Sequence, residues 1–109
     1  MRIIVICGAG ASSTFVATRL ARAADAAGVD LDVSACPLAS LPHEVGSADA
    51  ILLGAHMGAA EAEVRTVAEA HHVHVSALPA DIARDRDGSR TLALVRDEIP
   101  GSAPAESAR

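Results

Sequence analysis

The segment Arg2–Cys7 (RIIVIC) constrains the fold more than any other part of the chain. After Arg2 every residue is apolar, four in a row are β-branched, and Gly8 follows at once. An apolar run without alternation is typical of a strand that is buried on both faces of a parallel sheet. Because both faces of such a sheet must be covered by helices, the run predicts an α/β fold.

The rest of the sequence alternates between strand-like and helix-like segments. After a loop at Gly8–Thr14, the residues Phe15, Val16, Leu20, Ala23, Ala24 and Ala27 recur at helical spacing, and Gly28 is placed as a helix C-cap. Three more strands are predicted at Val29–Ala35, Ala50–Gly54 and Val73–Leu78. Helices are predicted at Ala59–His71 and Thr91–Ile99, with a short one within Leu38–Ala48 and a charged loop at Asp81–Arg90.

This alternation predicts a four-stranded parallel sheet of order 2-1-3-4, with right-handed crossovers and helices on both faces. The switch point of such a sheet lies between the carboxyl ends of strands 1 and 3, where open α/β sheets bind their ligands. The segments to inspect are therefore Cys7–Thr14 and Gly54–Gly58. We expect one domain over residues 1–99. Residues 100–109, rich in Pro, Ser and Ala, are expected to form a disordered tail.

Composition excludes several classes of function. The 109 residues carry a net charge of −5, all nine cations are arginine, and Phe15 is the only aromatic residue. Without a basic cluster or stacking side chains, no nucleic-acid binding is expected. No apolar run is long enough to span or insert into a membrane. Two cysteines are too few for a disulfide framework, so we expect a cytoplasmic protein with reduced thiols.

The loop after the first strand has the composition of an anion-binding site. Gly8 and Gly10 allow close backbone approach, Ala9 and Ala11 keep the concave face open, and Ser12, Ser13 and Thr14 supply hydroxyl groups. The following helix adds N–H donors and the positive end of its dipole. Cys7 opens this loop, and the same field is expected to stabilise its thiolate. The alternative is that Cys7 is simply a small buried residue at a strand end.

Three functions compete for this loop. Dinucleotide binding is weakly supported, because Gly8-x-Gly10-x-x-Ser13 lacks the third glycine. A cysteine-dependent phosphatase needs an arginine in the cradle, and Ser13 stands where the low-molecular-weight tyrosine phosphatases have theirs. A phosphoryl carrier needs only neutral donors around the cysteine, which the loop provides.

The segments IIVICGAGASST and LLGAHM (Leu52–Met57) resemble the IIB component of the lactose/cellobiose (chitobiose) family of the bacterial sugar phosphotransferase system. The resemblance runs from about residue 2 to residue 99. It implies a four-stranded parallel sheet like that of the low-molecular-weight tyrosine phosphatases. Ala11, Ala55-His56 and Ile82 depart from the residues common in the family, which leaves the sugar and the closest subfamily open.

The resemblance implies that Cys7 accepts a phosphoryl group from a phosphohistidine of a IIA partner and passes it to a sugar bound by the membrane IIC component. Gly8, Ala9, Gly10, Ala11, Ser12, Ser13 and Thr14 would bind the phosphoryl group, with no cofactor. The protein would act in the cytoplasm and visit the inner face of the membrane only through IIC. Two alternatives remain: an anion-sensing binding module that uses the same loop, and a cysteine-dependent phosphatase.

Other side chains are weaker candidates. His56 follows the third strand at the predicted switch point and could approach the phosphoryl group, or it could be an exposed loop residue. Cys36 ends the second strand and could reach Cys7 in a disulfide, although an inert thiol is the simpler interpretation. His71, His72 and His74 have no Cys or carboxylate at ligand spacing, so no metal site is expected.

Overall fold

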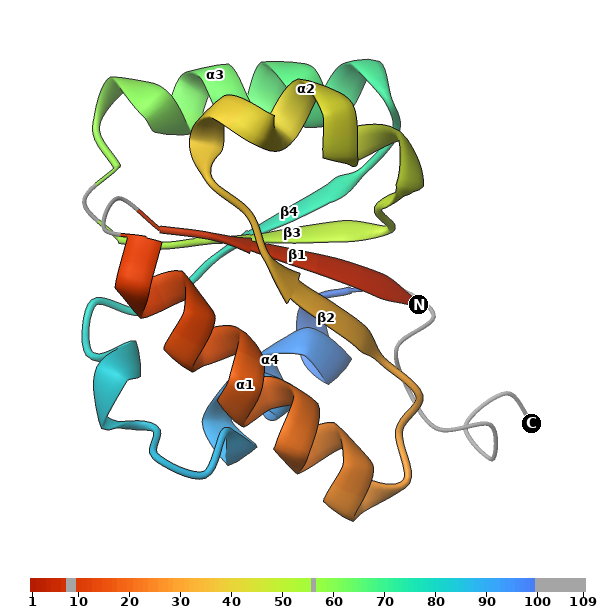
Figure 1. Ribbon diagram of the computed structural model, residues 1–109, viewed down its shortest axis with the longest axis vertical. Coiled ribbons are helices and arrows are strands. Elements are labelled where there is room, and N and C mark those ends of the chain that lie inside the picture. The colour runs from red at the N-terminus through yellow and green to blue at the C-terminus, as the bar shows by residue number, and fades with distance from the viewer. Residues whose placement is uncertain (8–9, 56, 100–109) are drawn as a thin grey trace.

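The computed structural model describes residues 1–7, 10–55 and 57–99, and it shows a parallel sheet between two layers of helices (Figure 1). The strands are β1 (Arg2–Ile6), β2 (Asp32–Ala35), β3 (Ala50–Leu53) and β4 (His74–Ala77). The α-helices are α1 (Gly10–Ala27), α2 (Leu41–Glu44), α3 (Ala59–Ala70) and α4 (Ser89–Glu98). Short 3₁₀ turns η1 (Leu38–Ser40) and η2 (Val45–Ser47) flank α2, and η3 (Ile82–Arg84) precedes α4.

The four strands are parallel and stand in the order β2-β1-β3-β4, which confirms the predicted topology. β1 pairs with β2 from Arg2 opposite Asp32, and with β3 from Ile3 opposite Ala50 to Ile6 opposite Leu53. The central strands therefore end side by side. In Figure 1 the carboxyl ends of β1 and β3 lie at the left edge of the sheet, where α1 begins.

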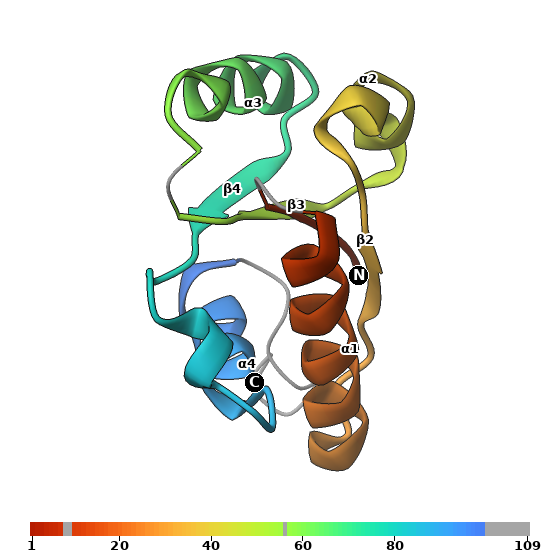
Figure 2. The same cartoon turned by 60° about the vertical axis from the view of Figure 1, so that its left-hand side comes forward.

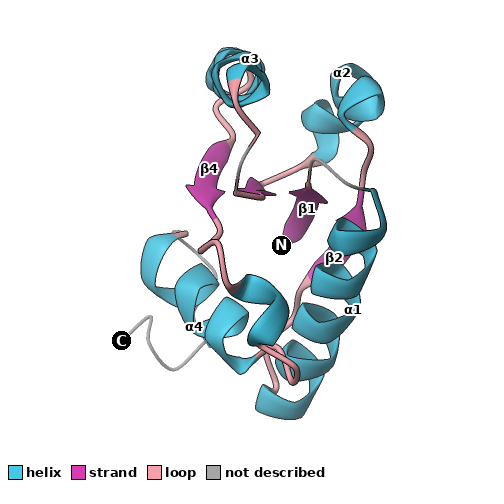
Figure 3. Cartoon of the chain, turned by 90° about the vertical axis from the view of Figure 1, so that its left-hand side faces the viewer, coloured by secondary structure: helices cyan, strands magenta, loops and turns pink. Residues whose placement is uncertain are grey.

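The helices cover the two faces of the sheet in pairs. Turning the molecule shows α1 and α4 on one face and α2 and α3 on the other (Figures 2 and 3). Successive side chains of a strand point to opposite faces, so each strand supplies both layers. In β1, Ile3 and Val5 face α1 and α4, whereas Ile4 and Ile6 face α2 and α3, and all four are fully buried.

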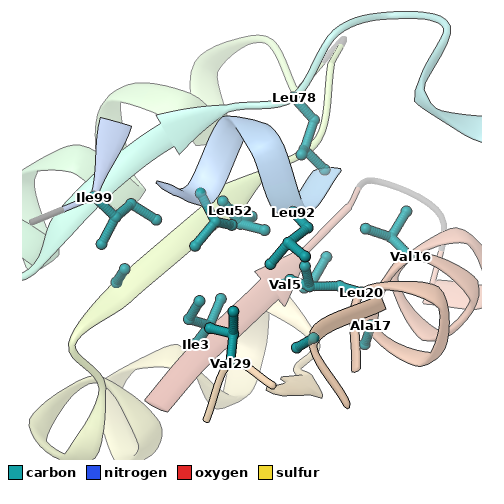
Figure 4. Packing of buried hydrophobic residues seen from close by; sticks show 13 residues of the cluster. Ile3, Val5, Val16, Ala17, Leu20, Val29, Leu52, Leu78, Leu92 and Ile99 are labelled. Atoms are coloured by element: carbon teal, nitrogen blue, oxygen red, sulfur yellow. The ribbon is translucent and has the colours of Figure 1, made fainter. Parts of the chain in front are cut away.

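The larger core lies between the sheet and the α1–α4 layer. Figure 4 shows Val5 of β1 packed with Leu20 of α1 and Leu92 of α4. The second core lies under α2 and α3 and includes Leu41, Val45 and Val64. The continuous apolar run of the first strand is thus explained by two cores, one on each side of it.

The structure corrects two predictions about the first helix. Phe15 is placed by periodicity on the apolar face, but its side chain is 60% exposed, and the buried face is formed by Val16, Ala17, Leu20 and Ala24. The helix also begins at Gly10, five residues earlier than predicted, so Gly10–Thr14 are helical rather than loop. Small and hydroxyl residues can form a first helical turn, although their composition reads as loop.

Candidate functional site

Cys7 and Gly54 are neighbours at the carboxyl edge of the sheet. Each follows directly on one of the two central strands, whose last paired residues are Ile6 and Leu53. The N–H of Gly54 donates a hydrogen bond to the carbonyl oxygen of Ile6, with an N···O distance of 2.7 Å. The predicted switch point is therefore formed by these two residues.

Gly54 leaves the space that the Cys7 side chain occupies. A Cβ atom built on Gly54 would lie 2.9 Å from Sγ of Cys7 and 3.1 Å from its Cα. The closer distance is shorter than any ordinary contact of a Cβ atom, so a side chain here would displace the cysteine. The sequence placed the segment that starts at Gly54 at the switch point, but it did not predict that Gly54 makes room for Cys7. The signal was available, since a glycine ends a buried strand that pairs with the cysteine strand.

Cys7 lies at the margin of the core rather than inside it. Its side chain is partly exposed and packs against the core on the α1–α4 face. Burial raises the pKa of the Cys7 thiol above its ordinary value. This is opposite to the stabilised thiolate expected from the loop, because the loss of solvent around the sulfur disfavours the charged form. A thiol with a raised pKa keeps its proton to a higher pH than a free cysteine does.

The start of α1 faces the same edge. The helix begins three residues after Cys7, so its first N–H groups, which have no partner within the helix, lie close to the cysteine in the chain. Of the predicted hydroxyl groups, Ser13 is buried, with 3% of its surface exposed, and Thr14 is exposed. Gly8 and Ala9 lie outside the described residues, as do the side chains of Ala11 and Ser12, so their role stays a prediction.

Cys36 lies on the opposite face of the sheet from Cys7. It is buried in the core beneath α2 and α3, and its thiol donates a hydrogen bond to the carbonyl oxygen of Pro37 at 3.2 Å. Burial and the neighbouring Glu44 carboxylate raise the pKa of this thiol. The sheet separates the two sulfur atoms, so the structure argues against a disulfide between them. The interpretation of Cys36 as an inert buried thiol agrees with this position.

The histidines do not assemble into a site in the described part of the chain. His56 lies outside the described residues, so its proximity to a phosphoryl group stays a prediction. His71 is the C-cap residue of α3, His72 follows it in a turn, and His74 begins β4. Across residues 1–7, 10–55 and 57–99 there is no group of three or more His, Cys, Asp or Glu that could hold a metal ion.

The sequence matches a known protein family. Residues 2–85 match the family model described as the lactose/cellobiose-specific IIB subunit of the PTS system. The chain belongs to this family. The match ends at residue 85, before α4, whereas the resemblance in the sequence was expected to extend to residue 99. Membership in this IIB family gives the protein a role in sugar phosphotransfer as a phosphotransferase component.

Solved structures agree in fold. The lactose-specific IIB domain of the phosphotransferase system from Streptococcus pneumoniae superposes with a TM-score of 0.80 at 18% identity, covering 90% of this chain and 96% of that one. The cellobiose-specific IIB component from Borrelia burgdorferi gives 0.73 at 17% identity, with 96% of both chains covered. At this identity the likeness establishes the four-stranded fold alone. None of the curated protein sequences compared matches the chain.

The family is one that works with partners, IIA and IIC in general. Within the described part of the IIB chain, no helix is both long enough and apolar enough to cross a membrane.

Proposed function

We propose that this IIB protein carries the phosphoryl group on Cys7. The observation that supports this most directly is the position of the cysteine: it stands between the carboxyl ends of the two central strands, opposite Gly54 and just before α1. Ligands of open α/β sheets bind at this edge. The partly exposed sulfur is open to a partner on one side and fixed by packing on the other.

The transfer is proposed in two steps. The Cys7 thiol loses its proton, its sulfur bonds to the phosphorus of a IIA phosphohistidine, and the N–P electron pair returns to the imidazole, which can take up a proton. In the second step a sugar hydroxyl bound by IIC attacks the phosphorus, the S–P bond breaks, and the sulfur recovers a proton. Both steps need positioning and charge stabilisation more than covalent machinery.

The raised pKa of the Cys7 thiol fits a carrier whose reactivity depends on its partner. A thiol that is protonated in the free protein is a weak nucleophile. The phosphohistidine of the donor would supply both the phosphoryl group and, on leaving, a base for the proton. This arrangement keeps Cys7 unreactive until the donor docks.

The backbone N–H groups from Gly8 to Gly10 and the hydroxyl groups of Ser12, Ser13 and Thr14 are proposed to hold the phosphoryl oxygens. The exposed side chain of Phe15, in the second turn of α1, is a candidate contact for the docking donor. Aromatic side chains, phenylalanine included, are enriched in the cores of protein interfaces. The proposed location is the cytoplasm, with visits to the membrane through IIC.

The experiment is phosphotransfer in a reconstituted system. The protein is incubated with phosphoenolpyruvate, the general phosphotransferase proteins, a IIA protein and membranes that contain a IIC permease, and sugar phosphate is measured. The expected result is sugar phosphate formation that requires the wild-type chain and is lost in Cys7→Ser. Formation that is equal with Cys7→Ser would contradict the proposal. Turnover of para-nitrophenyl phosphate without any transfer would favour the phosphatase instead.

A further inference from the structure

A groove that phosphotransfer at Cys7 does not use runs between α1 and α4. Its volume is about 620 Å³, and it is lined by the C-terminal half of α1, by α4 and by the loop before α4. Figure 2 shows these two helices side by side below the sheet. Arg22, in this groove, is about 18 Å along the helix axis from Gly10, at about 1.5 Å per residue. The groove is therefore separate from the Cys7 edge.

The floor of the groove is made of small apolar side chains. Ala23, Ala26 and Ala27 come from α1, and Leu92 and Ala93 come from α4. One end is closed by the loop before α4, where Gly88 has a φ of 78° and packs against the backbone of Arg19. A side chain at Gly88 would collide with that backbone, so the glycine fixes this wall against α1.

The rim of the groove is positively charged, although the whole chain is acidic. Arg19, Arg22, Arg86 and Arg96 line it, four of the nine arginines in a protein of net charge −5. Among the described residues Arg22, Arg86 and Arg96 form no ion pair, whereas Arg2, Arg65 and Arg90 do.

The lining of the groove holds one carboxylate, that of Asp87, beside the four arginines. Asp87 accepts hydrogen bonds from the backbone N–H of Ser89 at 3.0 Å and from its hydroxyl group at 2.8 Å. The lining therefore carries four arginines against one carboxylate, beside an apolar floor.

We propose that this groove binds an acidic amphipathic helix of a partner protein. The small side chains of the floor allow a third helix to approach α1 and α4 closely, as in helix-in-groove recognition. The arginines of α1 stand on one side and Arg96 on the other, so carboxylates flanking an apolar stripe would meet a cation on each side. A concave surface with an apolar floor fits a helix better than a flat membrane. A partner held here would leave Cys7 exposed.

The test uses a synthetic helical peptide with Ala and Leu on one face and Glu on both flanks, and a matched peptide with Lys in place of Glu. Binding to the full chain is followed by calorimetry and by NMR shift mapping. We expect saturable binding of the Glu peptide only, with shifts at Ala26 and Ala93 and weakening by salt. The double variant Arg22→Glu, Arg96→Glu should lose at least about tenfold in affinity. Both arginines are exposed, and circular dichroism checks that the variant is folded.

Arg65→Glu is a control on the other face of the sheet, because Arg65 lies on α3 and is also exposed. It should leave the affinity for the peptide unchanged. The proposal is overturned by three results: no binding of the Glu peptide up to about 1 mM, equal affinity in the double variant, or shifts that map elsewhere. Two other occupants of the groove are tested in parallel: a lipid surface and the C-terminal residues 100–109 of the chain itself. The proposal is also overturned if the chain binds phosphatidylglycerol vesicles and not the peptide, or if the peptide binds only to a chain shortened to end at Ile99.

Discussion

Gly54 and Cys7 are packed so closely that the glycine has no room for a side chain: a Cβ atom there would lie 2.9 Å from the cysteine sulfur. The contact joins the ends of the two central strands. Gly54 therefore positions Cys7, a role that a glycine at the end of a strand does not have by itself.

Substitution of Gly54 by alanine is predicted to move Cys7. The added methyl group must displace either the sulfur or the backbone of the cysteine, at a cost of about 1–3 kcal/mol for overpacking. We expect a lower urea midpoint and a changed alkylation rate of Cys7. Gly46→Ala is the matched control, because nothing lies within 4 Å of a Cβ atom built there. Equal behaviour of the two variants would show that the contact does not constrain Cys7.

The thiols predict a loss of stability at alkaline pH. Burial raises the folded-state pKa of both Cys7 and Cys36, so the unfolded chain loses its thiol protons first as the pH rises. The stability that the two thiols contribute is full below the unfolded thiol pKa of about 8.5 and falls as the pH rises through the folded values. The urea midpoint of the double variant Cys7→Ala, Cys36→Ala should therefore fall less at high pH than that of the wild type.

The same shift predicts slow alkylation of Cys7 near neutral pH. The alkylation rate of Cys7, followed by peptide mass mapping, should rise with pH and level off at a higher pH than in the urea-unfolded chain. The unfolded chain is the reference, because its thiol has the ordinary pKa. A rate that is already maximal at neutral pH would mean that the loop stabilises the thiolate after all.

Oxidation is predicted not to join the two cysteines within one molecule. Cys7 packs on the α1–α4 face and Cys36 on the α2–α3 face, so the sheet lies between them. Treatment with diamide should leave the folded monomer without an internal disulfide, as judged by peptide mapping under non-reducing conditions. A Cys7–Cys36 peptide from the native monomer would contradict the packing described here.

The sequence predicted the sheet because strands and helices alternate along it and the central strands carry apolar runs; Ala50–Leu53 is buried throughout, as is Ile3–Ile6 of β1. It misplaced Phe15 because helical periodicity alone does not tell which edge of an apolar face meets the sheet. The start of α1 was missed because glycine, alanine and serine are compatible with both a loop and a helix. The raised Cys7 pKa could not be foreseen, since it depends on how much solvent the packing removes.

The charged run Asp81–Arg90 also shows that the sequence does not tell which side chains are buried. Its composition predicts an exposed loop of mixed charge, and only the packing distinguishes the buried carboxylate from the exposed ones. Asp85 is buried, and its carboxylate accepts hydrogen bonds from the N–H of Arg90 at 3.1 Å, from the N–H of Thr91 at 2.8 Å and from the Thr91 hydroxyl at 2.7 Å. It thus satisfies the first turn of α4, where the N-cap residue Gly88 has no side chain to do so.

Removal of this carboxylate should destabilise the fold. Asp85→Ala leaves two backbone donors and a buried hydroxyl without their acceptor, at a cost of about 1–3 kcal/mol. Urea unfolding should show a lower midpoint than for Asp97→Ala, which removes an exposed carboxylate from α4 itself. If both variants unfold at the same midpoint, the carboxylate of Asp85 does not support α4.

The proposal that Cys7 carries the phosphoryl group is tested most directly by the mass of the protein itself. The chain is incubated with a phosphorylated IIA protein, and intact-mass and peptide measurements follow the wild type, Cys7→Ser and Cys36→Ser. We predict one added phosphoryl group on the peptide that contains Cys7, in the wild type and in Cys36→Ser, and none in Cys7→Ser. An adduct on Cys7→Ser, or none on the wild type with any IIA donor, would contradict the account.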